Sequence, residues 1–143
     1  MKHEKELQDL VQEISGIDHS ALHGKVLKSY LINAYNILVI HQAVLRYRGF
    51  PESEKYDEII PCEEPGFYSN KIQDVGGKRM SLNELKEILM ERGKDLRVFS
   101  LLSPATMGGP VLSSYAYKPL GLNHHLKQGM KRISDDRNFV RKI

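Results

Sequence analysis

The sequence has 143 residues, a length that fits one domain with a buried core. Hydrophobic residues make up 41% and charged residues 27%, values close to globular averages, so a disordered chain is not expected. The formal net charge of +3 is mild, and no stretch of about 18 apolar residues predicts a membrane span. We therefore expect a single soluble domain over residues 1–143.

Cysteine usage and the first residues bear on the compartment. Cys62 is the only cysteine, so no intramolecular disulfide framework can form, which suits a reducing compartment. The charged start Met1–Glu6 does not resemble a secretory leader. These features predict a cytoplasmic protein, although a trimmed sequence would also lack its signal peptide.

Two helices are expected in the first third of the chain. Apolar residues recur at helical spacing over Lys2–Ser15, and Gly16 suits the end of that helix. The stretch Val26–Leu45 is apolar on nearly all sides, which is typical of a buried helix. Gly49 and Pro51 predict that it ends near Arg48.

The middle of the chain is expected to contain short strands. Gly76-Gly77 is a tight-turn signal between Phe67–Asp74 and Lys78–Met80, which predicts a hairpin. Tyr56–Ile60 is a further candidate for an extended segment.

The remaining elements alternate in type. Ser81 and Glu84 have capping-box spacing and predict a helix that Gly93 closes. The apolar stretch Arg97–Leu102 is interpreted as a buried strand, and Pro119 as the start of a last helix. A final strand is expected at Asn138–Ile143. This order predicts an α+β fold, with helices packed on one side of a small, mostly antiparallel sheet.

Three polar residues interrupt the predicted buried helix. Asn33 and Asn36 lie on one side of it, and buried carboxamides must be hydrogen-bonded. They either clamp loop backbone, for example at Ser103–Pro110, or orient a ligand. His41 lies on the apolar stripe and is either a satisfied core histidine or a general base.

The loop Ser103–Pro110 follows a predicted strand, a common place for a site. Its small residues Gly108 and Gly109 allow close backbone approach, and free amides could bind an anion. Ser103 and Thr106 are conceivable nucleophiles, but neither lies in a nucleophile-elbow pattern. A plain structural turn is the alternative interpretation.

Other clusters predict little chemistry. The histidine pairs lack a third ligand at zinc spacing, so neither a metal nor a cofactor is expected; the pairs are His19 with His23 and His124 with His125. Residues 118–143 carry seven basic and two acidic residues, which is interpreted as a solvated helix face or as a contact for an anionic surface. No aromatic residues interleave with these charges, so nucleic-acid binding is not expected.

Several strings resemble the domain of unknown function 547 family. Tyr30–His41 resembles its "FWINAYNALTIH" helix, and Val75–Asn83 resembles its "GG…LSLND" junction. Arg97–Leu112 is similar to its block of a strand, a small-residue loop and Pro-x-Leu. Tyr115–Asn138 is similar to its "EAY…L…DPRN" ending. The resemblance covers about residues 30–138 and implies that the C-terminal part of the family domain is missing here.

The chain departs from the family pattern at reactive positions. The family string "HFALVCASKSCP" has one histidine and two cysteines, where this chain has Phe99, Pro104 and Gly109. The family's "IEH" corresponds to Leu85–Glu87, so Glu87 replaces a histidine. Thiol or metal chemistry of that form is therefore not expected here.

These observations predict a non-catalytic or degenerate domain that binds a protein partner or a small ligand. The expected ligand-binding residues are Asn33, Tyr35, Asn36, Gly108 and Gly109. The alternative is an acyl-type hydrolase or transferase, with Ser103 or Thr106 as nucleophile and His41 as base.

Overall fold

The longest element is a central helix, α2 (Gly24–Arg48), in a computed structural model that describes residues 4–48, 65–102 and 116–135. In the described part the other elements are α1 (Glu4–Gly16), η1 (His19–Ala21), β1 (Gln73–Val75), β2 (Lys78–Met80), α3 (Leu82–Gly93), η3 (Leu96–Leu101) and α4 (Leu122–Asp135). The end of α2 at Arg48 agrees with the prediction.

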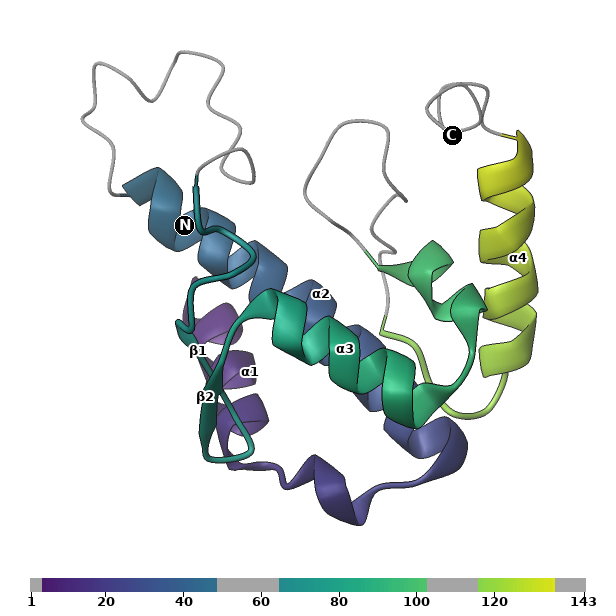
Figure 1. The fold of residues 1–143 in the computed structure, drawn as a ribbon, viewed down its shortest axis with the longest axis horizontal. Helices are drawn as coiled ribbons and strands as arrows, with labels where there is room; N and C mark the ends of the chain where they lie inside the picture. Colours follow the sequence, from purple (N-terminus) through teal and green to yellow (C-terminus); the bar gives the residue numbers. More distant parts are fainter. Residues whose placement is uncertain (1–3, 49–64, 103–115, 136–143) are drawn as a thin grey trace.

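Helix α2 is the hub of the core because apolar side chains leave it on several sides. Leu31, Ile32 and Leu38 are fully buried, as expected of a helix that is apolar nearly all round. α3 packs along α2, while α1 and the hairpin lie on one side of this pair. α4 lies on the other side and packs mainly against η3 (Figure 1).

The predicted hairpin forms, and its turn also caps a helix. β1 and β2 pair antiparallel, with Val75 opposite Lys78. Gly76 and Gly77 have φ angles of 60° and 84°, in the left-handed region that glycine favours. Their amides donate to the carbonyls of Ile14 (3.1 Å) and Ser15 (2.9 Å) at the end of α1. The turn thus satisfies carbonyls that α1 leaves without helical partners.

The predicted capping box of α3 is confirmed. The Ser81 hydroxyl accepts from the Glu84 amide at 3.1 Å, and the Glu84 carboxylate accepts from the Ser81 amide at 3.2 Å. Near the other end of α3, the Arg92 guanidinium donates to the carbonyls of His19 (2.8 Å) and Leu22 (2.9 Å). This arginine ties η1 to α3.

The predicted strand at Arg97–Leu102 is wrong, since this stretch is the 3-10 helix η3. Asp95 caps it by accepting from the Arg97 amide at 3.1 Å, which turns the chain before a strand can begin. Val98 and Leu101, three residues apart, are both buried, and a 3-10 helix places residues at this spacing on one side. A short apolar run does not distinguish these two structures by periodicity.

The β content of the described part is therefore smaller than predicted, and the fold there is largely α with one two-stranded antiparallel hairpin. The predicted strand Phe67–Asp74 is reduced to Gln73–Val75, because the chain turns at Gly66 (φ 84°). Pro119 lies in the turn before α4 and does not open it. Tyr56–Ile60 and Asn138–Ile143 lie outside the described residues.

Among the helices of residues 4–48, 65–102 and 116–135, none combines the length and apolar character needed to cross a bilayer.

Candidate functional site

The two asparagines of α2 hold backbone from distant parts of the chain. Asn33 accepts from the Tyr117 amide at 2.9 Å and donates to the Tyr117 carbonyl at 2.7 Å. Asn36, which is 5% exposed, donates to the Leu101 carbonyl at 2.9 Å. We call Asn33 and Asn36 the asparagine clamp.

The position of the clamped residues bears on the two interpretations of this pair. Leu101 and Tyr117 stand on either side of residues 103–115, which lie outside the described part. The observed bonds are therefore the backbone clamp that the sequence suggested, made at the flanks of that segment. A role of the same carboxamides toward a ligand stays a prediction.

A second polar group joins the C-terminal half of α2 to β1 through side chains. His41 Nδ1 lies 3.2 Å from Gln73 Oε1, and Gln73 Nε2 donates to Gln42 Oε1 at 3.2 Å. Gln42 Nε2 in turn donates to the Phe67 carbonyl. We call His41, Gln73 and Gln42 the carboxamide relay.

The donors and acceptors along the relay are fixed by the Phe67 carbonyl, at which it ends. A backbone carbonyl can only accept, so Gln42 presents its NH₂ group to Phe67 and its oxygen to Gln73. Gln73 must then present its own oxygen to His41, and His41 Nδ1 must carry a proton. In the neutral ring, this tautomer leaves Nε2 as the acceptor.

His41 and the asparagine clamp bond to different parts of the chain. His41 bonds to Gln73 of β1, whereas Asn33 bonds to Tyr117 and Asn36 bonds to Leu101 of η3. Gln42 and Gln73, which are 4% and 2% exposed, are not among the site residues predicted from the sequence. A glutamine within an apolar helix was the available signal, since a buried carboxamide needs partners.

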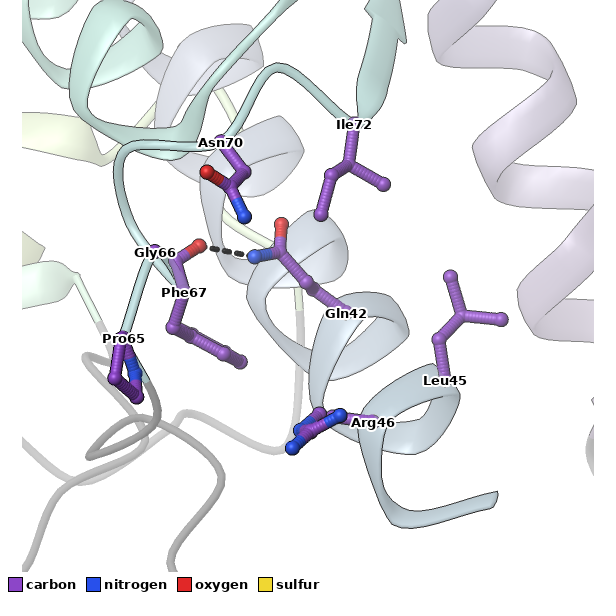
Figure 2. A pocket seen from close by; sticks show the side chains of 8 residues that line it. All are labelled: Gln42, Leu45, Arg46, Pro65, Gly66, Phe67, Asn70 and Ile72. Carbon is purple, nitrogen blue, oxygen red and sulfur yellow. Dashed lines mark hydrogen bonds between the residues drawn. The ribbon is translucent and has the colours of Figure 1, made fainter. Parts of the chain in front are cut away.

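A cleft of about 350 Å³ opens beside the relay (Figure 2). Gln42 forms part of its wall, and Figure 2 draws its hydrogen bond to the Phe67 carbonyl as a dashed line. Leu45 and Ile72 are 43% and 39% exposed and also line it. The remaining lining residues are Arg46, Pro65, Gly66 and Asn70. The volume lies in the range of small-molecule sites, and the wall combines apolar surface with a few amides.

Two departures from the family pattern line the same depression. Glu87 on α3 and Phe99 on η3 both line an open depression of about 430 Å³. Pro104 and Gly109, the other departures, lie outside the described residues.

The remaining predicted site residues are placed as follows. Tyr35 is 1% exposed, and burial raises the pKa of its phenol to about 12. Ser103, Thr106, Gly108 and Gly109 lie outside the described residues, as does Cys62.

The histidine pairs of the sequence analysis are partly engaged with other side chains. His19 Nδ1 lies 3.1 Å from Arg92 Nη1, and burial followed by this arginine's charge lowers the pKa of the imidazole. The His124 and His125 rings lie 6.0 Å apart. Within residues 4–48, 65–102 and 116–135 no three His, Cys, Asp or Glu side chains form a group suited to a metal ion.

Comparison with known proteins identifies the family. The family described as "Protein of unknown function, DUF547" matches over residues 20–132, which is most of the chain. No curated protein and no solved structure matches. The family match includes α2, the hairpin, α3 and most of α4, the elements that carry the asparagine clamp and the carboxamide relay. This chain belongs to the DUF547 family.

Proposed function

We propose that this protein is a non-catalytic binding domain, which receives a small ligand or a partner side chain in the cleft beside Gln42. The observation that carries the proposal is the makeup of this cleft. Two half-exposed apolar side chains, Leu45 and Ile72, stand beside the Gln42 carboxamide, whose orientation the relay determines. A ligand with an apolar body and one or two hydrogen-bonding groups fits such a wall.

The non-catalytic part of the proposal is supported by the residues at the positions where the family pattern has reactive side chains. Where the family pattern has histidines, this chain has Glu87 and Phe99. The asparagines that could orient a substrate already bond to backbone at Leu101 and Tyr117. Carboxamides that already bond to backbone favour a structural role over a role in catalysis.

A fragment screen by NMR tests the proposal on the whole chain. Fragments that bind the cleft should shift the signals of Gln42 and Ile72. Leu45→Ser should weaken a confirmed fragment about five- to tenfold, because it removes apolar surface from the contact. Val26→Ser is the matched control, since Val26 is a similarly exposed apolar residue (48%) on the same helix. Equal weakening by both variants, or the lack of any fragment at the cleft, would contradict the proposal.

The second candidate is the acyl-type hydrolase or transferase, and the relay is the observation that favours it. An amide oxygen that accepts from His41 Nδ1 orients the ring and leaves Nε2 free to act as a base. The nucleophile would be Ser103 or Thr106, both outside the described residues.

An ester and thioester panel separates the two candidates. The second candidate requires turnover that His41→Ala and one of Ser103→Ala or Thr106→Ala abolish, and that Gln73→Ala lowers. Such a result would replace the first proposal. Turnover that survives His41→Ala, or no turnover at all, would remove the second candidate.

A further inference from the structure

The outer face of α3 carries a depression that is separate from the cleft beside Gln42. It measures about 430 Å³ and is lined by Asn83, Lys86, Glu87, Met90 and Glu91 of α3 and by Phe99 of η3. The α3 residues recur three and four apart, so they form one stripe of the helix. The opposite stripe, with Leu82, Leu85 and Leu89, is buried in the core. The depression is thus a solvent-facing surface with an aromatic wall.

A cation already sits on the aromatic wall. Lys86 Nζ lies 5.2 Å from the centroid of the Phe99 ring. The face of an aromatic ring is electron-rich and attracts ammonium and guanidinium groups at this distance. Met90 adds a polarizable side chain to the same wall. The ring therefore presents a face that attracts cations, and in this structure Lys86 occupies it.

The charges around the ring favour the same kind of ligand. Glu87 and Glu91 stand four residues apart on α3, and both are exposed. Neither makes a hydrogen bond or an ion pair with any residue that the structure describes. Like charges at this spacing repel each other and destabilise a helix, and a bound cation would remove this repulsion. The lining has a net negative charge, because Lys86 is its one basic residue against two glutamates.

We propose that this depression is a second binding site, which takes a compact organic cation, namely an alkylammonium or guanidinium group. The cation replaces Lys86 over the Phe99 ring, and its N–H groups point to the carboxylates of Glu87 and Glu91. The site is independent of the proposed cleft beside Gln42, so either can fail without the other.

Agmatine, neopentylammonium and its neutral counterpart neopentyl alcohol are the probes, titrated into the full chain and followed by NMR. The two cations should shift the signals of residues 86–91 and of the Phe99 ring, whereas the neutral alcohol should not. Phe99→Leu keeps an apolar side chain but removes the ring, and should weaken cation binding about two- to fivefold. Glu87→Gln should weaken it by a similar factor. Lys86→Gln should strengthen binding, because it removes the competing cation.

A matched control separates a local site from general electrostatics. Glu13→Gln on α1 makes the same change in net charge at an exposed position away from the depression. The proposal is overturned if Glu13→Gln weakens binding as much as Glu87→Gln, if Phe99→Leu has no effect, or if the neutral alcohol binds equally well. A short blocked peptide with one arginine identifies the source of the cation. Tighter binding of the peptide than of agmatine assigns the site to a protein partner, and the reverse assigns it to a free amine.

Discussion

The two halves of α2 use buried carboxamides in different ways. In the first half, Asn33 and Asn36 bond directly to backbone more than sixty residues away along the chain. In the second half, Gln42 bonds to Gln73 of β1, which bonds to His41, and Gln42 also donates to the Phe67 carbonyl beside an open cleft.

The difference suggests different duties for the same chemical group. A carboxamide that bonds to distant backbone fixes how segments pack, so its loss should appear in the free energy of unfolding. A carboxamide held by other side chains fixes its own orientation, so its loss should appear in the geometry of the neighbouring cleft. The following predictions test this division.

The largest effect is expected at the asparagine clamp. Asn36→Ala removes a buried donor from the Leu101 carbonyl and should lower the free energy of unfolding by about 2–3 kcal/mol. Chemical denaturation measures this change. Asn123→Ala, at an exposed position of α4, is the control and should change little. If the two variants lose equal stability, Asn36 does not act as a clamp.

The next largest effect is expected where Gly129 of α4 packs against Ser100 and Leu101 of η3. A Cβ atom at Gly129 would lie 2.2 Å from Ser100 Oγ and 2.9 Å from a Leu101 methyl group. Gly129→Ala should therefore destabilise the protein by about 1–2 kcal/mol, even though alanine favours a helix. Thermal unfolding compared with Gln128→Ala checks it. A gain in stability would show that α4 does not pack closely on η3.

Breaking the carboxamide relay should lower the free energy of unfolding less than the two changes above, but should alter the cleft beside Gln42 more. Gln73→Leu leaves Gln42 and the half-buried His41 without their shared partner, at about 1 kcal/mol. The side-chain amide signals of Gln42 should move in an NMR spectrum, because its oxygen loses the Gln73 donor. Asn36→Ala should leave those signals in place. If Asn36→Ala moves them as far, the two halves of α2 are not separate.

The smallest effect is a pH dependence at the start of η3. Hydrogen bonds from the Arg97 guanidinium, and then from its amide and from Lys28, lower the pKa of Asp95 to about 2 from 3.8. Its stabilising contribution is present above pH 3.8 and is lost as the pH falls through about 2. Because Arg97 is 38% exposed and therefore screened, we expect only about 0.5 kcal/mol. Asp95→Asn should lose this amount at neutral pH and show a flatter acid limb, and an unchanged limb would contradict the assignment.

Local signals predicted much of the fold. The α3 capping box and the Gly-Gly turn depend on residues within a few positions of each other, and both form as expected. The failure at Arg97–Leu102 has a local cause that the apolar pattern concealed, namely the cap that Asp95 provides. A cytoplasmic location and a single domain over residues 1–143 stay predictions, for cell fractionation and limited proteolysis to test.

The site was predicted less completely, because its members come from separate elements. That Asn33 and Asn36 needed partners followed from carboxamides on an apolar helix. Which partners they have depends on how η3 and Tyr117 pack against α2. Gln73 lies in a strand of only three residues, and its neighbours in sequence do not indicate that it meets His41.

The sequence by itself determined the buried character of α2, the turn at Gly76-Gly77 and the requirement that polar groups on α2 be satisfied. These follow from side-chain hydrophobicity and backbone preference, which act over a few residues. Only the tertiary structure decided the direction of the carboxamide relay, the cleft beside Gln42 and the depression that Glu87 and Phe99 both line. Each of these depends on hydrogen bonds or packing between residues far apart in sequence, and pattern alone does not specify such pairings.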